Sequence, residues 1–175
     1  EIDLSIASMI ALTAVIFGTA YNAGLGMPIS MVIALLSGTL CGLFNGILVT
    51  QLQIPSIILT IGTLTLYRGI AQSLASDFSL GGYPSWFIGI DYRYVGVVPI
   101  PVIIFTVFAI VVGFFLSSTI YGKQLYLIGT NPQTAKYSGI KVNKIKLLLF
   151  TLSGLVCGIA GILTTSRLAV ARFNM

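Results

Sequence analysis

The sequence predicts an all-α polytopic membrane protein, a bundle of about five transmembrane helices, and three observations lead to that prediction. Apolar residues make up 57% of the 175 residues and charged residues only 7%, whereas a soluble surface is usually about a quarter to a third charged. No residue from Leu4 to Tyr67 carries a formal charge. Several apolar stretches approach the roughly 20 residues that a helix needs to cross a bilayer.

Five apolar stretches define the expected spans along the chain. The first is short, and the third contains Gly62, Arg68 and Gly69, so a half-helix or a re-entrant segment is an alternative to a full span for either one. The expected spans are Leu4–Ala20, Pro28–Val49, Ile54–Ala75, Val97–Ser118 and Leu147–Ser166.

Glycines recur at every fourth residue in two of these spans. Gly38, Gly42 and Gly46 share one face of the second span, and Gly154 and Gly158 share one face of the fifth. Because helices in lipid approach closely through small residues, these faces predict tight helix contacts, with the lining of a permeation path as the alternative. The two spans also resemble each other and are expected to run in opposite directions. An inverted repeat explains this resemblance, and so does chance similarity between two Gly-rich helices.

The segment Thr119–Lys146 has the composition of protein that faces water. It holds five of the nine basic residues and no Asp or Glu, and excess Lys between spans marks the cytoplasmic side. We therefore expect Glu1–Asp3, Thr50–Gln53 and this segment inside, and Tyr21–Met27, Ser76–Gly96 and the chain from Arg167 onward outside. The charges of Ser76–Gly96, which are Asp77, Asp91 and Arg93, agree with the outer side.

A short helix is predicted within this basic segment. Asn131 is suited to cap it, Pro132 to occupy its first position, and Gly139 to end it. A capped helix on an inner loop is typical of a docking element, although the Lys excess is also explained by a role in topology alone.

Several classes of chemistry are not supported by the composition. The chain has no His and only four acidic residues, so we expect no catalytic residues, no metal site and no cofactor. There is no Gly-rich loop that ends in Lys-Ser or Lys-Thr for nucleotide binding. The net charge of +5 comes largely from the inner segment, so nucleic acid is not an expected partner.

Four blocks of sequence follow one another along nearly the whole chain. The blocks are Glu1-Ile-Asp-Leu-Ser-Ile-Ala-Ser, Asn45-Gly-Ile-Leu-Val-Thr, Ile54-Pro-Ser-Ile-Ile-Leu-Thr-Ile-Gly-Thr with Tyr67-Arg-Gly-Ile-Ala, and Tyr121-Gly-Lys-Gln-Leu-Tyr-Leu-Ile-Gly-Thr-Asn-Pro-Gln-Thr-Ala-Lys-Tyr-Ser-Gly-Ile140. In their order and spacing they resemble the permease subunits of bacterial ATP-binding-cassette (ABC) sugar importers, the family of the ribose, galactose, xylose and autoinducer systems, and the first block resembles that family's signature Gly-Ile-Asp-Leu-Ser-Val-Gly-Ser.

The resemblance implies a multi-pass permease of the bacterial inner membrane that moves a monosaccharide, with ATP hydrolysis on a separate subunit. Its implied partners are cytoplasmic ABC ATPase subunits, a second permease copy or sister permease, an extracytoplasmic sugar-binding protein and the lipid bilayer. The segment 119–146 would be the cytoplasmic coupling loop of one permease domain that spans residues 1–175. This piece is expected to be truncated at both ends.

The resemblance also implies roles for particular residues. The coupling helix would use Asn131, Pro132, Thr134, Ala135, Lys136 and Gly139, and Thr134-Ala135-Lys136 departs from the Ala-Ala-Arg that is frequent in the family.

The substrate path is expected to include Arg68, Asn45, Thr60 and Thr63. Arg68 would donate hydrogen bonds to sugar hydroxyls, or would instead extend its side chain to the outer interface. The aromatic residues of the outer segment would form an interfacial belt, or else an outer gate or platform for the binding protein; they are Phe78, Tyr83, Trp86, Phe87, Tyr92 and Tyr94.

Other functions stay open at this point. Permeases for nucleosides or for an autoinducer are alternatives within the ABC class. An ion-coupled secondary carrier is an alternative from another class, which the lack of carboxylates in the middle of the spans disfavours. A purely structural membrane scaffold would have no need of a capped inner helix.

Overall fold

The computed structural model describes residues 1–75, 80–90 and 93–172. The predictions made for Asp77, Phe78, Asp91 and Tyr92 lie outside these residues. The predicted all-α bundle is confirmed: among the described residues, five helices are long and apolar enough, by length and composition, to cross a membrane.

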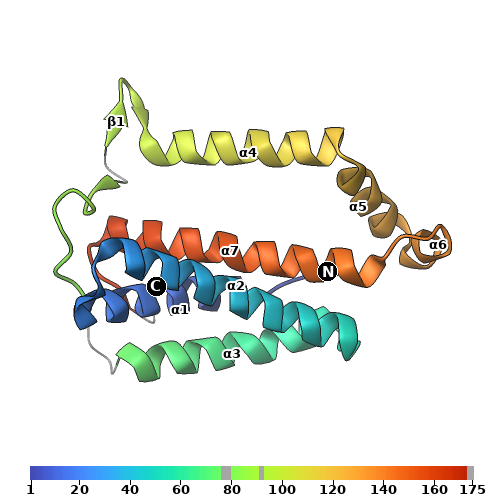
Figure 1. Ribbon diagram of the computed structural model, residues 1–175, viewed down its shortest axis with the longest axis horizontal. Helices are drawn as coiled ribbons and strands as arrows, with labels where there is room; N and C mark the ends of the chain where they lie inside the picture. The colour runs from blue at the N-terminus through green and yellow to red at the C-terminus, as the bar shows by residue number, and fades with distance from the viewer. Residues whose placement is uncertain (76–79, 91–92, 173–175) are drawn as a thin grey trace.

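Most of the elements follow one another with short connections, whereas a long connection leads from α3 to β1 (Figure 1). A π-helical turn, η1, extends the first helix. An antiparallel hairpin of two strands, β1 and β2, each two residues long, precedes the fourth long helix. The elements are α1 (Ile6–Ala20), η1 (Tyr21–Leu25), α2 (Met27–Gln51), α3 (Ser56–Ala75), β1 (Tyr94–Val95), β2 (Val98–Pro99), α4 (Ile100–Ser118), α5 (Ile120–Thr130), α6 (Pro132–Tyr137) and α7 (Val142–Leu168).

Successive long helices alternate in direction, as the sequence predicts (Figure 1). The connection between α2 and α3 lies at the same end of the bundle as α5 and α6, and η1 and the β hairpin lie at the other end. We call the first of these the Lys-rich end. Which end faces the cytoplasm stays a prediction from the Lys bias.

Three expectations about the elements are refined by the structure. The third apolar stretch forms one uninterrupted helix, α3, which agrees with the expected span rather than with the alternative of a half-helix or a re-entrant segment. The first apolar stretch continues through η1, so that Ile6–Leu25 is long enough to span. The segment 119–146 is mostly helical, because α5 occupies its first part and α7 begins at Val142 rather than at Leu147.

The glycine faces of α2 and α7 meet directly, which confirms the predicted tight contact. A Cβ atom added to Gly42 would lie 2.2 Å from the carbonyl oxygen of Phe150, and one added to Gly154 would lie 2.2 Å from the carbonyl oxygen of Gly38. Only a residue without a side chain allows backbones to approach this closely. These helices run in opposite directions (Figure 1).

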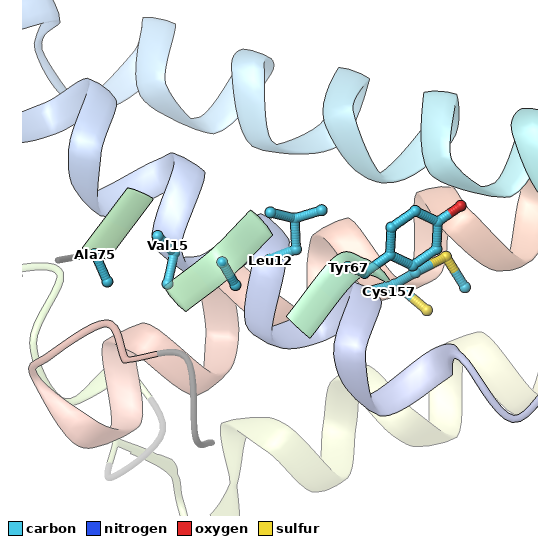
Figure 2. Packing of buried hydrophobic residues seen from close by; sticks show 7 residues of the cluster. Leu12, Val15, Tyr67, Ala75 and Cys157 are labelled. Carbon is cyan, nitrogen blue, oxygen red and sulfur yellow. The ribbon is translucent and has the colours of Figure 1, made fainter. Parts of the chain in front are cut away.

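The apolar core lies where α1 packs against α3 and α7 (Figure 2). Leu12 and Val15 of α1 contact Tyr67 and Ala75 of α3, together with Cys157 of α7, in one buried cluster. Most of α1 is buried, so this helix is the centre of the bundle.

Helix α4 differs from the other spans because none of its residues is buried. It is set apart from α1, α2, α3 and α7 in Figure 1 and continues at the Lys-rich end into α5. The position of α4 is therefore determined by its connections to the hairpin and to α5.

Candidate functional site

Helix α6 has the cap and the stop that the sequence predicts. The side-chain oxygen of Asn131 accepts hydrogen bonds from the backbone N–H groups of Gln133, at 2.9 Å, and Thr134, at 3.1 Å. Pro132 occupies the first turn, and Gly139 adopts a φ of 81° just after the helix. These groups satisfy backbone donors that would otherwise have no partner, so six residues hold a helical conformation.

One buried side chain fixes α6 to its neighbours. Ala135 is 3% exposed and belongs to an apolar cluster with Ile128 of α5 and with Val142 and Ile145 of α7. Every other residue of α6 is exposed, and Tyr137 reaches 89%. The helix thus presents Thr134 and Lys136 outward on a short, supported platform.

A sharp elbow connects α4 to α5. Thr119 adopts an extended backbone, accepts a hydrogen bond from the N–H of Gly122 at 3.1 Å, and donates one to the carbonyl of Phe115 at 2.6 Å. A Cβ atom at Gly122 would lie 2.1 Å from the carbonyl oxygen of Leu116. Sequence reasoning missed this elbow and α5. Thr119 is of a residue type that is preferred at helix N-caps, and this preference could have indicated where α5 begins.

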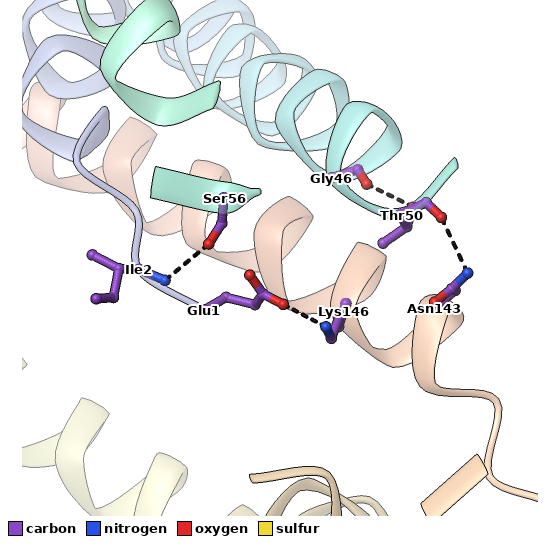
Figure 3. Close-up of polar contacts among 7 residues, drawn as sticks. All are labelled: Glu1, Ile2, Gly46, Thr50, Ser56, Asn143 and Lys146. Atoms are coloured by element: carbon purple, nitrogen blue, oxygen red, sulfur yellow. Dashed lines mark hydrogen bonds and ion pairs between the residues drawn. The ribbon is translucent and has the colours of Figure 1, made fainter. Parts of the chain in front are cut away.

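Polar contacts join the helix ends on the same side of the bundle (Figure 3). Glu1 forms an ion pair with Lys146 of α7, and the backbone N–H of Ile2 donates to the hydroxyl of Ser56, at the start of α3, at 3.3 Å. The hydrogen bond from Lys146 is the main reason that the pKa of Glu1 lies below its ordinary value, and a hydrogen bond from Ser56 acts in the same direction.

Two cavities flank this ion pair and reach α6. The larger, of about 440 Å³, lies between the N-terminal segment, α5 and α7. The smaller, of about 340 Å³, lies between α6, the α2–α3 connection and the start of α7, where the side chain of Asn143 donates to the carbonyl of Thr50 at 3.1 Å. Both cavities are lined by Glu1, Pro132 and Lys146. Hence any movement of α6 relative to α7 would change both of them.

The predicted path residues do not all lie together. Asn45, Thr60 and Thr63 are buried between helices, whereas Arg68 is exposed on α3. The amide of Asn45 donates to the hydroxyl of Ser5 and accepts from the hydroxyl of Tyr67, each at 2.9 Å. In this conformation Asn45 therefore joins α1, α2 and α3.

The segment between α3 and β1 contributes to a buried aromatic cluster at the end opposite α6. The ring of Phe17 lies 5.5 Å from that of Tyr83 and 5.4 Å from that of Phe87. The hydroxyl of Ser166, in α7, donates to the carbonyl of Phe87 at 2.5 Å. Tyr83 and Phe87 thus pack onto α1, while Trp86 is half exposed and remains suited to an interfacial position.

Comparison with known proteins supports a transport role. A protein-family model described as "Branched-chain amino acid transport system / permease component" matches residues 1–175. The chain is 37% identical over 170 residues to the autoinducer 2 import system permease protein LsrC of Enterobacter sp. (strain 638), which covers 96% of this chain and 49% of that protein. It is 34% identical over 180 residues to LsrD, another autoinducer 2 import system permease protein, of Escherichia coli (strain K12), with 99% and 54% covered.

The chain spans about half the length of these curated relatives. No solved structure matches it. The match to the family model extends over every residue, and the relatives are described as permease proteins of an import system. The resemblance to the permeases of ABC importers is thereby confirmed, and the chain belongs to the family described as "Branched-chain amino acid transport system / permease component".

Proposed function

We propose that this chain is the membrane-spanning part of an ABC importer subunit that moves a monosaccharide across the bacterial inner membrane. The observation that carries the proposal is α6: a helix capped by Asn131, held on α7 by Ala135, and exposed on its remaining surface. A rigid, exposed helix can transmit the movement of a bound ATPase to the spans, whereas a mobile loop cannot.

The proposed partners are those that the resemblance to ABC permeases implies. The ATPase subunits would seat α6 in a groove and contact Thr134 and Lys136, both of which are exposed. The second permease copy or sister permease would pack in the membrane, and the sugar-binding protein would approach the end that carries the aromatic cluster. ATP hydrolysis would take place on the ATPase subunits and not on this chain.

Arg68 is our candidate for direct contact with the solute. It is exposed on α3, next to buried Tyr67, and its planar guanidinium suits hydrogen bonding to several hydroxyl groups at once. Asn45, Thr60 and Thr63 would join the path only if the helices separate during transport. Full rescue of uptake by Arg68→Lys after loss with Arg68→Ala would favour a position at the lipid interface instead.

The coupling role is tested by variants of α6 in the intact permease. Ala135→Pro removes a backbone donor and breaks the helix, so the variant should insert normally but lose ATPase binding and solute-stimulated hydrolysis. Asn131→Ala removes the cap, at about 1 kcal/mol, and should show a weaker effect in the same direction. Asn131→Asp keeps an acceptor at the cap and is the matched control.

The outcome that overturns the coupling role is an Ala135→Pro variant that binds ATPase and imports solute as well as the parent. Lys136→Glu tests whether the contact with the ATPase is electrostatic. If it is, the loss of ATPase binding in this variant should be larger at low salt, whereas a contact that depends on shape should show no salt dependence.

A panel of labelled pentoses, hexoses, nucleosides, autoinducer 2 and leucine, each with and without ATP, identifies the solute. Uptake that needs an ion gradient but no ATP would indicate an ion-coupled carrier.

A further inference from the structure

The α2–α3 connection contains a backbone conformation that its residue type does not favour. Helix α2 ends at Gln51, and Gln53, the second residue after it, has a φ of 53°. A left-handed residue commonly follows a helix at this position, and it is usually glycine because a side chain makes the conformation less stable. In the described part of the chain, the other residues with positive φ are glycines, except Ala169. The presence of a long side chain at Gln53 therefore needs a reason other than the backbone.

Contacts within the chain do not supply that reason. Gln53 is exposed, and its amide has no hydrogen-bond partner among the described residues. The residue lines the smaller cavity at the Lys-rich end, of about 340 Å³, together with residues of α6 and α7. The amide of Gln53 is thus available to a group that enters this cavity.

The elements around the cavity are held on one helix. Asn143 of α7 donates to the carbonyl of Thr50, near the end of α2, at 3.1 Å (Figure 3). Ala135 holds α6 in the apolar cluster that includes Val142 of α7. Because α7 supports both the α2–α3 connection and α6, the cavity keeps its shape without a partner, which lowers the cost of binding into it.

The polar groups around the cavity are complementary to a carboxylate. Glu1 supplies the one carboxylate of the lining and forms an ion pair with Lys146. The ammonium of Lys136 has no ion-pair partner among the described residues. The amides of Gln53 and Gln133 line the same cavity and are exposed, so they can donate hydrogen bonds. A carboxylate accepts charge-assisted hydrogen bonds from both kinds of donor, whereas Lys136 repels a cation.

We propose that the cavity receives an acidic side chain of the ATPase subunit, whose carboxylate binds Lys136 and the amide of Gln53. The α2–α3 connection is then a second contact with the ATPase beside α6. This inference rests on the proposed coupling role of α6 and extends it to a residue outside the coupling loop. Pro132, Gln133 and Lys136 of α6 line the cavity, so a protein that is seated on α6 meets it. The phosphate of an acidic lipid has the same charge as a carboxylate and is a separate outcome of the test.

The first test places photoreactive benzoylphenylalanine at single positions of the intact permease, in lipid membranes with its ATPase. At position 133 it should cross-link to the ATPase if α6 is the docking helix. At position 53 it should cross-link to the ATPase if the α2–α3 connection is a second contact. Leu25 is the control position, because it is exposed at the other end of the bundle and should give no cross-link to the ATPase.

The second test removes the side chain of Gln53 without straining the backbone. Glycine suits a positive φ, so Gln53→Gly should keep the melting temperature of the parent, while its affinity for the ATPase should fall about tenfold, the effect of one hydrogen bond to a charged group. Lys136→Gln should lower the affinity at least as much. The double variant should lose less than the product of the two effects, because both groups bind one carboxylate. Lys123→Gln is the control, since Lys123 is exposed and does not line the cavity.

Three outcomes would overturn the inference while leaving the coupling role of α6 intact. They are a cross-link to the ATPase from position 133 but not from position 53, a cross-link from position 53 to lipid alone, and an affinity of Gln53→Gly for the ATPase equal to that of the parent. Absence of a cross-link to the ATPase from both positions would instead overturn the coupling role of α6, and this inference with it.

Discussion

Substitution of Gly42 by Ala tests the closest contact in the bundle. The added Cβ would lie 2.2 Å from the carbonyl oxygen of Phe150 and 2.9 Å from the Cα of Gly154, whereas ordinary contact begins at 3.4 Å. The difference between 2.2 and 3.4 Å means that α2 and α7 must move apart by about 1 Å, and a gap of that size forfeits a quarter to a half of the dispersion energy of the atoms along it.

The expected cost is that of overpacking a well-packed core, about 1–3 kcal/mol. At about 2–4 °C per kcal/mol for a chain of this size, the melting temperature should fall by roughly 2–12 °C. Thermal unfolding of the purified protein in detergent, followed by circular dichroism, measures this change.

Matched controls separate the contact from the effect of removing a glycine. Gly62 and Gly69 lie in α3, and a Cβ atom at either position meets nothing within 4 Å. Their replacement by Ala should be neutral or slightly stabilising, because Ala favours a helix over Gly by about 1 kcal/mol. If Gly42→Ala melts at the same temperature as Gly62→Ala, the backbones of α2 and α7 do not approach as closely as described here.

Three further predictions concern the helix ends and the buried network. Gly122→Ala should open the elbow between α4 and α5, because its Cβ would meet backbone at 2.1 Å; insertion should persist while solute-stimulated ATP hydrolysis falls, and normal coupling would refute the rigid elbow. The lowered pKa of Glu1 means that its pair with Lys146 stabilises fully above the ordinary value of 4.5 and is lost as the pH falls through the lowered pKa; melting profiles at several pH values should show this slope in the parent and not in Glu1→Gln. Tyr67→Phe removes the donor to the buried amide oxygen of Asn45 and should cost about 1–3 kcal/mol in thermal unfolding, so an unchanged melting temperature would contradict this account of the network.

Features that depend on neighbouring residues in the chain were predictable from the sequence. The apolar stretches placed all five spans, because a helix in lipid must satisfy its backbone groups internally and must be apolar along its length. The cap and stop of α6 were predictable because Asn131 and Gly139 act on backbone within three residues. The facing glycines of α2 and α7 were visible as a spacing of four, which places small residues on one side of a helix.

The continuity of α3 could not be deduced from residue types alone. Gly62 and Gly69 weaken a helix in water, and the charge of Arg68 is costly within a membrane, yet all three lie on the exposed side of α3. In lipid the backbone has no other hydrogen-bonding partner than its own helix, so α3 stays regular across all three positions.

Only the tertiary structure brought distant groups together at the candidate sites. The pairing of Glu1 with Lys146 and the hydrogen bond between Asn45 and Tyr67 join residues that lie far apart in the chain, and no local pattern encodes which surfaces will meet. Helix α5, in which polar and apolar residues are mixed, was also not predictable from local pattern. Its position depends on the elbow at Thr119 and on the burial of Ile128 against α6 and α7. Local hydrogen bonding and hydropathy act between near neighbours in the chain and determine the elements, whereas close packing depends on the shapes of surfaces that only the assembled bundle presents to one another.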